Sequence, residues 1–142
     1  MPSRSPPRLS GILESSLYVA DLERSVAFYT GVVGCELFLQ DERMCALGVA
    51  PGQVLLLFRK GGSAMPTEAA GGIIPAHDGD GQLHLCFSAP ASERAAWCAQ
   101  LAAHGVAIES DLRWPHGGRS LYFRAPDGHA IEIATPGLWP TY

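Results

Sequence analysis

The same order of secondary-structure elements is predicted twice along the chain, and this repeat constrains the fold more than any other feature. Residues 12–20 alternate between apolar and polar side chains, which is typical of a strand with one apolar face. Asp21 can cap a helix, and apolar residues then recur at helical spacing until the glycines at 31 and 34. Three short apolar stretches follow and predict strands at 36–39, 44–48 and 54–58.

A second copy of this order follows a glycine-rich connection at residues 61–81. Its elements are predicted as a strand at 83–87, a helix at 93–104 capped by Ser92, and strands at 106–109, 120–124 and 129–134. The order βαβββ twice predicts an α+β fold of two modules. Their curved mixed sheet would carry the helices on its outer face and leave an open concave cavity on the other. One such unit buries little surface by itself, so we expect the halves, or two chains, to pack together.

Size and composition fit one globular domain. The chain has 142 residues, of which 47% are hydrophobic and 17% are charged. The expected organisation is a flexible tail at 1–11 and a single domain at 12–142, with module one at about 12–60, the connection at 61–81, module two at about 82–135 and a C-terminal tail at 136–142.

Charge and hydropathy exclude two classes of partner. The net charge is −4 and Lys60 is the one lysine, so no basic stripe is available for a nucleic-acid backbone. No apolar run approaches the length that spans a membrane. The first residues lack the apolar core of a signal peptide, and the four cysteines form no CxxC pair. We therefore expect free thiols and a cytoplasmic protein.

Strand alternation places three potential ligands on the concave face. In the last strand, Ile131 and Ile133 point to one face and Glu132 points to the other, where its neighbours are alanines. The same phase argument puts Glu14 of the first strand and His84 of the fifth on this face. One nitrogen and two carboxylate donors suit Mn²⁺, Fe²⁺, Ni²⁺, Co²⁺ or Zn²⁺. Each residue also has an ordinary interpretation, as a solvated or hydrogen-bonded strand side chain.

Two stretches of the sequence resemble one known superfamily. The segment from Leu17 to Gly34, LYVADLERSVAFYTGVVG, is similar to the opening of the vicinal oxygen chelate superfamily, and residues 118–133, GRSLYFRAPDGHAIEI, are similar to its closing motif. That superfamily includes glyoxalase I, bleomycin-resistance proteins, fosfomycin-resistance enzymes, methylmalonyl-CoA epimerase and extradiol dioxygenases. The resemblance implies paired βαβββ modules and a divalent metal held by Glu14, His84 and Glu132.

The sequence departs from particular members of this superfamily. Glyoxalase I enzymes add a glutamate from the fourth strand, where this chain has Leu56. Extradiol dioxygenases use two histidines and one glutamate, and here Glu14 replaces the first histidine. Fosfomycin-resistance enzymes share the sequence of residues 119–123, but they also use histidine as the ligand from the first strand. The end motifs therefore indicate the superfamily and leave the activity open.

Further residues are candidates for substrate contact. Tyr122 shares a face with Ser120 and could donate a hydrogen bond to an oxyanion, while Glu132 could move a proton. Arg119 could bind a carboxylate or phosphate. His77 lies on the glycine-rich connection and His116 on a second flexible loop, and both could close over a ligand.

These observations predict a metal-dependent enzyme that chelates a small oxygen-rich substrate for isomerase, lyase or ring-opening chemistry. A homodimer is expected. The alternatives are a non-catalytic small-molecule binding protein of the bleomycin-resistance type and an Fe(II) extradiol dioxygenase.

Overall fold

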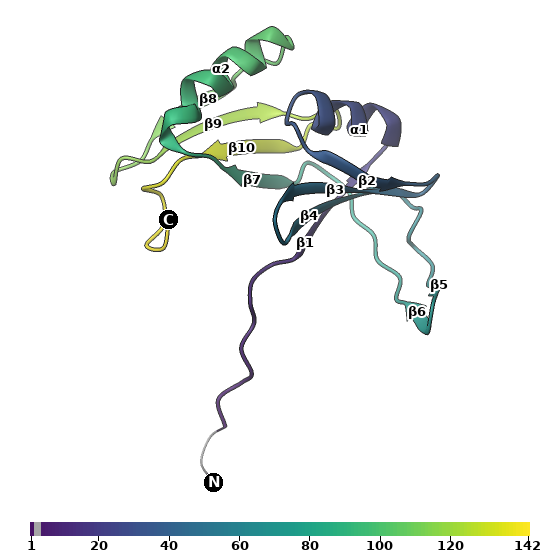
Figure 1. The fold of residues 1–142 in the computed structure, drawn as a ribbon. Coiled ribbons are helices and arrows are strands. Elements are labelled where there is room, and N and C mark those ends of the chain that lie inside the picture. The colour runs from purple at the N-terminus through teal and green to yellow at the C-terminus, as the bar shows by residue number, and fades with distance from the viewer. Residues whose placement is uncertain (2–3) are drawn as a thin grey trace.

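A computed structural model describes residue 1 and residues 4–142, and its first half forms one βαβββ module (Figure 1). The strands of this half form a four-stranded sheet in the order β1-β4-β3-β2, in which β1 runs parallel to β4. Asp21 caps the helix as predicted, because its side chain accepts a hydrogen bond from the Arg24 backbone N–H at 3.1 Å. The elements of module one are β1 (Glu14–Val19), α1 (Leu22–Gly31), β2 (Glu36–Gln40), β3 (Met44–Ala50) and β4 (Gln53–Arg59).

The second half repeats this arrangement. Its sheet has the order β7-β10-β9-β8, and β10 runs parallel to β7. The α+β fold of two similar βαβββ modules is therefore confirmed, with each module forming a mixed four-stranded sheet. The elements of module two are β7 (His84–Ser88), the short 3-10 helix η1 (Ala91–Glu93), α2 (Arg94–Ala103), β8 (Ser110–Arg113), β9 (Arg119–Arg124) and β10 (Ala130–Ala134).

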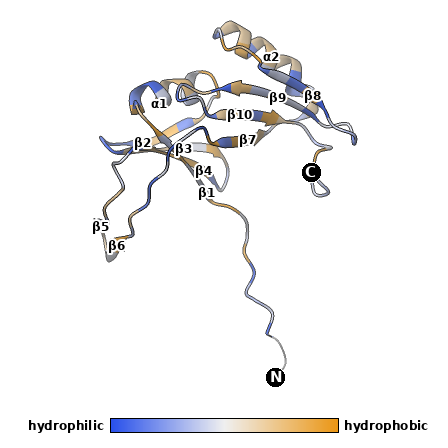
Figure 2. Ribbon diagram, turned by 180° about the vertical axis from the view of Figure 1, so that it is seen from behind, coloured by the Kyte–Doolittle hydropathy of each residue, from blue (hydrophilic) through white to orange (hydrophobic). Residues whose placement is uncertain are grey.

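The helices lie over the same side of the two sheets and share one apolar core with them (Figure 1). Leu17 and Val19 of β1 and Ile131 and Ile133 of β10 are buried in this core, as their strand phase predicts. The strand β10 is largely hydrophobic (Figure 2). Alternate residues of β1, β7 and β10 therefore face away from the helices, and this is the face on which the candidate ligands lie.

The turn before β10 fastens module two to module one. The Asp127 carboxylate accepts a hydrogen bond from the Ala20 backbone N–H at 2.9 Å. The His129 ring is 1% exposed and lies 3.0 Å from both the Leu83 nitrogen and the Tyr18 carbonyl oxygen. Because the Leu83 N–H donates to Nδ1, the neutral ring donates from Nε2 to the Tyr18 carbonyl. Two residues of the closing motif thus hold the modules together.

Three details differ from the sequence prediction. The strand expected at 106–109 is found at Ser110–Arg113, because Val106 ends the preceding helix through a hydrogen bond to the Leu101 carbonyl and packs against the core. Ser92 lies inside η1, and α2 begins after Glu93 without a side-chain cap. The glycine-rich connection contains a hairpin of β5 (Thr67–Ala69) and β6 (Gly72–Ile74), which projects from module one (Figure 1).

The two ends of the chain behave differently. Residues 4–11 carry no helix or strand and extend away from the sheets (Figure 1), while residues 2 and 3 of the expected tail lie outside the described part. The Leu13 carbonyl accepts a hydrogen bond from the Val54 N–H at 2.8 Å, so the chain is joined to β4 just before β1 begins. At the other end, the Tyr142 hydroxyl donates to the Ala134 carbonyl at 2.7 Å, so the last residues fold back onto β10. Within the described residues, no helix is long and apolar enough to cross a membrane.

Candidate functional site

Glu132 is the centre of a polar cluster on the open face of module two. The residue is 4% exposed, and its two carboxylate oxygens have different partners. Oε2 accepts a hydrogen bond from the Ser120 hydroxyl at 2.5 Å, and Oε1 lies 3.2 Å from Nε2 of His84. Parallel pairing of β7 with β10 explains this approach, because it aligns His84 with Ala130, two residues before Glu132 on the same face.

The hydrogen bond at the other ring nitrogen determines the proton position in His84. Nδ1 lies 2.9 Å from the Ala130 carbonyl oxygen, which can only accept, so Nδ1 carries the proton. In the neutral ring, Nε2 then turns a lone pair toward Oε1 of Glu132. Two electron-rich atoms at 3.2 Å need a cation between them, either a proton on Nε2 or a metal ion. A histidine whose second nitrogen donates to a carbonyl is the usual arrangement of a metal-binding imidazole.

Trp114 completes this cluster and was not identified from the sequence. Its indole N–H donates to the Ser120 hydroxyl oxygen at 2.8 Å. Since an indole nitrogen can only donate, Ser120 accepts from Trp114 and directs its own proton to Glu132. Trp114 follows β8 directly, and the prediction that placed this strand at 106–109 hid its proximity to Ser120. Correct hairpin pairing of 110–113 with 119–122 would have revealed it.

Tyr122 and Cys86 flank Glu132 on the two neighbouring strands. Burial, followed by the charge of Glu132, raises the pKa of the Tyr122 phenol, so this group stays protonated and able to donate. Burial and then the same charge raise the pKa of the Cys86 thiol to about 12. The Tyr122 ring also stacks beside His84, with centroids 6.1 Å apart. The cluster therefore presents an unpaired imidazole nitrogen and a carboxylate oxygen beside a phenol donor.

Glu14 lies elsewhere within the single chain. It is exposed on the open face of module one, where it borders a cavity of about 680 Å³, here called the module-one cavity. Among residue 1 and residues 4–142, no three His, Cys, Asp or Glu side chains gather where they could hold a metal ion. His84 and Glu132 are therefore together, and Glu14 lies apart from them on module one. Their predicted role as a ligand set stays a prediction.

The strand registers relate the position of Glu14 in module one to that of His84 in module two. Glu14 pairs with Val54 as His84 pairs with Ala130, so the module-one counterpart of Glu132 is Leu56. Leu56 lines the module-one cavity. The fourth-strand position that supplies a carboxylate in glyoxalase I enzymes is therefore apolar in this structure.

The predicted substrate-contact residues are distributed over several places. His77 lines the module-one cavity, and its Nδ1 lies 2.7 Å from the Tyr18 hydroxyl. Ser120 is fully buried between Trp114 and Glu132. The Arg119 guanidinium is bound to Asp111 at 3.2 Å, while His116 is exposed in the turn between β8 and β9. Contacts of these residues with a substrate stay predictions.

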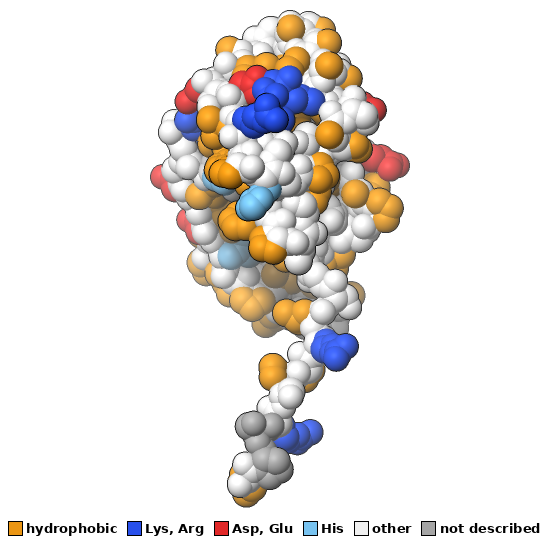
Figure 3. Space-filling view, turned by 90° about the vertical axis from the view of Figure 1, so that its left-hand side faces the viewer, with side chains coloured by type: hydrophobic (Ala, Val, Ile, Leu, Met, Phe, Trp, Pro, Cys, Tyr) orange, Lys and Arg blue, Asp and Glu red, His pale blue; other side chains and the backbone are white. Residues whose placement is uncertain are grey.

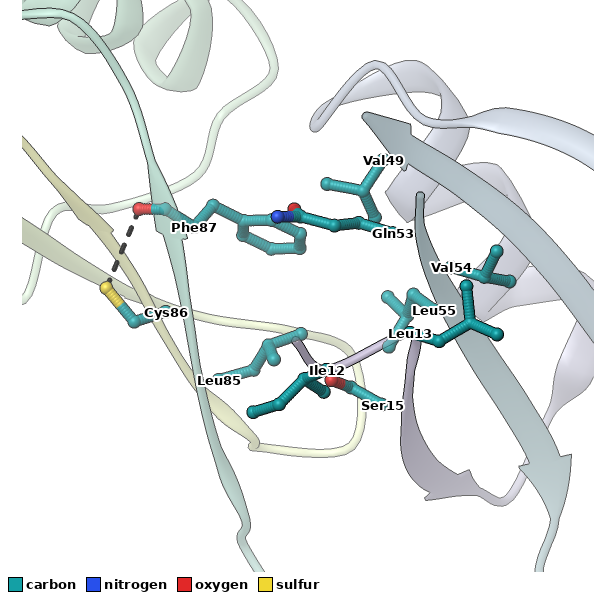
Figure 4. A pocket seen from close by; sticks show the side chains of 10 residues that line it. All are labelled: Ile12, Leu13, Ser15, Val49, Gln53, Val54, Leu55, Leu85, Cys86 and Phe87. Atoms are coloured by element: carbon teal, nitrogen blue, oxygen red, sulfur yellow. Dashed lines mark hydrogen bonds between the residues drawn. The ribbon is translucent and has the colours of Figure 1, made fainter. Parts of the chain in front are cut away.

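A smaller hollow of about 190 Å³ lies between the sheets. Leu85 and Phe87 of β7 face Leu13, Val49 and Leu55 of module one across it (Figure 4). Its lining is mainly apolar, and the Cys86 thiol at its edge lies 3.6 Å from the Phe87 carbonyl oxygen. This hollow is a seam between the modules and borders the cluster at Glu132 through Cys86.

Comparisons with known proteins support the same superfamily. The sequence profile described as Glyoxalase/Bleomycin resistance protein/Dioxygenase superfamily matches residues 11–133. The chain is 29% identical over 124 residues to a catechol-2,3-dioxygenase of Bacillus subtilis (strain 168); the match covers 84% of this chain and 39% of that protein. This chain therefore spans well under half the length of that relative.

Solved structures resemble the fold over nearly its full length. A lactoylglutathione lyase from Agrobacterium tumefaciens is 35% identical with a TM-score of 0.84, covering 96% of this chain and 99% of that one. An integron cassette protein from the mobile metagenome of the Halifax Harbour sewage outfall is 26% identical with a TM-score of 0.71, covering 89% and 99%. From its sequence profile and its paired modules, the chain belongs to the glyoxalase/bleomycin resistance protein/dioxygenase superfamily.

Proposed function

We propose that this protein is a metal-dependent enzyme that binds a small oxygen-rich substrate on a divalent cation held by His84, Glu132 and Glu14. The observation that carries this proposal is the approach of His84 Nε2 to Glu132 Oε1 at 3.2 Å, with the tautomer set by the Ala130 carbonyl. Both atoms present lone pairs toward one point on an open face. The nitrogen and oxygen donors suit Mn²⁺, Fe²⁺, Ni²⁺, Co²⁺ or Zn²⁺.

We infer that the third ligand, Glu14, comes from a second copy of the chain. In one chain Glu14 borders the module-one cavity, apart from the cluster at Glu132. The chain also exposes large apolar side chains, including Phe38 at 57% and Leu39 at 52% in the edge strand β2. Hydrophobic side chains are also visible in patches on the face shown in Figure 3. A homodimer that pairs module one of one protomer with module two of its partner would cover apolar surface and complete two sites.

The residues around the site have distinct chemical roles in this proposal. A bound divalent cation would act as a Lewis acid toward adjacent oxygens of the substrate. Tyr122, protonated because its pKa is raised, donates a hydrogen bond to an oxygen that gains negative charge. Glu14 or Glu132 accepts and returns a proton at a carboxylate oxygen. Ser120 and Trp114 hold Glu132 in place.

Isomerase, lyase and ring-opening reactions fit these roles because each proceeds through developing charge on a substrate oxygen. The structural similarity to a lactoylglutathione lyase supports this class. Similarity to a catechol-2,3-dioxygenase supports the alternative of an Fe(II) extradiol dioxygenase. The apolar lining of the module-one cavity supports the other alternative, a binding protein without chemistry. All four cysteines are free, which supports a cytoplasmic location.

Metal content measured by elemental analysis tests the proposal. Wild-type protein reconstituted with Mn²⁺ is expected to retain near-stoichiometric metal, and His84→Ala, Glu132→Gln and Glu14→Gln are each expected to lose it. His104→Ala is the matched control, because His104 is exposed at the end of α2. Retention of metal in all three site variants, or no metal in the wild type, contradicts the enzyme and favours the binding protein.

Mixing two inactive variants tests whether the site is shared. Glu14→Gln and His84→Ala protomers are unfolded together, mixed equally and refolded. If the site spans two chains, half of the dimers are mixed and each has one intact site, so metal content recovers to about a quarter of wild type. If all ligands come from one chain, the mixture recovers nothing.

A further inference from the structure

The module-one cavity shares one boundary with a second hollow. This hollow, of about 460 Å³, lies beside the turn between β3 and β4 and is here called the edge cavity. Phe38 of β2 and Val54 of β4 line both cavities. The remaining lining of the edge cavity includes Glu36, Gly48, Pro51 and Gln53. The side chain of Phe38 therefore lies where the two cavities meet.

One row of paired residues leads from Glu14 to this boundary. The first sheet has the order β1-β4-β3-β2, in which Glu14 pairs with Val54 and Val54 pairs with Gly48. Neighbouring strands lie about 4.8 Å apart, so Gly48 is about 10 Å from Glu14 across the sheet. A ligand that begins at Glu14 and extends across the open face toward β2 passes over Val54 and then reaches Gly48.

The Phe38 ring occupies the space over Gly48. A methyl group at the Cβ position of Gly48 would lie 2.8 Å from Cε1 and 2.9 Å from Cε2 of Phe38, and closer still to Cζ. Carbon atoms in favourable contact lie about 3.5–4.0 Å apart, so the ring can take this position only because residue 48 has no side chain. The end of the ring therefore blocks the row at Gly48.

An irregularity in β2 directs Phe38 toward the open face. Leu37 pairs with Leu47 of β3, while Leu39 pairs with Ala46, so Phe38 is the extra residue of a β-bulge. Phe38 and Leu39 consequently both line the module-one cavity, although neighbours in a regular strand point to opposite faces. Bulges often re-aim a side chain beside a functional site, and this one places an aromatic ring across the floor of the cavity.

The distance from Glu14 to the ring is fixed within one chain. The whole row belongs to module one, so its length is independent of how module two of a partner would pack in the proposed dimer. That partner module would cover the open face and add side chains above the ligand. Phe38 and Leu39 are adjacent and similarly exposed, at 57% and 52%, and Leu39 lines the module-one cavity without lining the edge cavity. Leu39 is therefore the matched control for loss of apolar surface.

We propose that Phe38 is a specificity-determining residue, which limits the length of the ligand by closing the module-one cavity off from the edge cavity. A ligand body that fits between Glu14 and Gly48 leaves the ring in place, whereas a longer body must displace it. Glu36 in the edge cavity disfavours an anionic tail there, so the tail excluded by the ring is an uncharged one. Only the position of the ligand's polar end at Glu14 rests on the proposed metal function.

Straight-chain hydroxamic acids, from butanohydroxamic to dodecanohydroxamic acid, measure this length limit by isothermal titration calorimetry on the full chain. Their heads present two adjacent oxygens, and their tails differ only in the number of methylene groups. On metal-free protein, each methylene that becomes buried should tighten binding about fourfold. We expect the affinity of the wild type to rise with chain length and then level off. Phe38→Ala should level off at least two methylenes later, and so bind the longest acids at least about tenfold more tightly than the wild type.

Two further variants test the cause of the limit. Leu39→Ala should level off at the same chain length as the wild type. Gly48→Ala places a methyl group against the ring, so it should change the chain length at which the wild type levels off. The same substitution in the Phe38→Ala background should change nothing, because no ring is left to displace.

Several outcomes would overturn the role of Phe38. These are a wild-type affinity that never levels off, a Phe38→Ala variant that levels off with the wild type, and an equal shift in Leu39→Ala. Equal effects of Gly48→Ala in the two backgrounds would show that the ring does not lie on Gly48, and would overturn it as well.

Titration in the presence of Mn²⁺ separates this inference from the proposed metal function. Mn²⁺ is expected to tighten all the acids by a similar factor, because they share one head group. If the length limit behaves as expected but Mn²⁺ leaves every affinity unchanged, the role of Phe38 stands and the metal function fails. If Mn²⁺ tightens every acid but the length limit is absent, the metal function stands and the role of Phe38 fails.

Discussion

Replacing Ser120 with alanine removes the hydrogen bond that holds Glu132. The Ser120 hydroxyl is fully buried, donates to the carboxylate at 2.5 Å and accepts from Trp114 at 2.8 Å. A hydrogen bond to a charged group contributes about 1.5–3 kcal/mol, and the indole N–H also loses its acceptor. Because Trp114 is half-buried, water can replace part of that second loss. We therefore expect Ser120→Ala to lower the free energy of unfolding by about 2 kcal/mol.

Thermal unfolding followed by circular dichroism measures this loss. For a chain of 142 residues, a loss of about 2 kcal/mol lowers Tm by roughly 6–8 °C. Trp114→Phe keeps an aromatic ring but removes the N–H donor together with the five-membered ring of the indole, so a decrease in Tm of at least roughly 3 °C is expected. Trp139→Phe is the matched control at an exposed tryptophan and should leave Tm unchanged.

Metal affinity provides a second readout for the same variants. Residues that orient a metal ligand typically change affinity by about 10–100-fold when replaced, so Ser120→Ala should weaken Mn²⁺ binding by about tenfold in competition with a chelator. A loss of about 1 kcal/mol corresponds to a decrease in Tm of about 3 °C or more. A Tm for Ser120→Ala within about 2 °C of wild type would therefore refute the assigned hydrogen bonds. Unchanged metal affinity would refute the role of Ser120 in positioning Glu132.

Three further predictions concern the hydrogen bonds of His129, the buried hydroxyl of Tyr29 and the ion pairs of Asp111. His129→Ala should lower the free energy of unfolding in urea by about 3 kcal/mol, because it removes two part-buried hydrogen bonds, one to Leu83 within module two and one to Tyr18 of module one; an effect no larger than that of the exposed His104→Ala would contradict this. Tyr29→Phe should stabilise the protein by about 1 kcal/mol, since among the described residues the buried Tyr29 hydroxyl has no hydrogen-bond partner; measurable destabilisation in urea would reveal one. The side-chain bond from Arg94, with a further contribution from Arg119, lowers the pKa of Asp111, so its stabilisation is present above about pH 4 and is lost as pH falls through the lowered pKa. Asp111→Asn should therefore have a lower Tm than wild type at pH 7, and the difference should shrink as pH falls below about 4; a difference that stays constant with pH would contradict this.

Strand phase predicted the faces of the candidate residues because burial of one sheet face leaves little freedom. Leu17 and Ile131 are buried in the core, and Glu14, His84 and Glu132 lie on the opposite face, as the alternation of apolar and polar residues indicated. The repeated βαβββ order was predictable for the same reason. Whether residues on corresponding faces of the two modules meet depends on how the modules pack, and periodicity within a strand contains no information on that.

Local hydrogen bonds account for the details that the sequence did not predict. Val106 was assigned to a strand because it is β-branched and apolar, but its backbone N–H ends the helix at Leu101. That shift concealed the contact between Trp114 and Ser120. The roles of Asp127 and His129 in joining the modules were also hidden, because their partners are backbone groups more than 40 residues away. Such pairings follow from tertiary structure.

Anomalous diffraction from crystals grown with Mn²⁺ tests the proposed metal site most directly. We expect a peak about 2.0–2.3 Å from His84 Nε2 and Glu132 Oε1, with Glu14 of a second copy as the third protein ligand. A metal peak away from His84 and Glu132, or an Mn²⁺-saturated crystal with none beside them, would contradict the proposal.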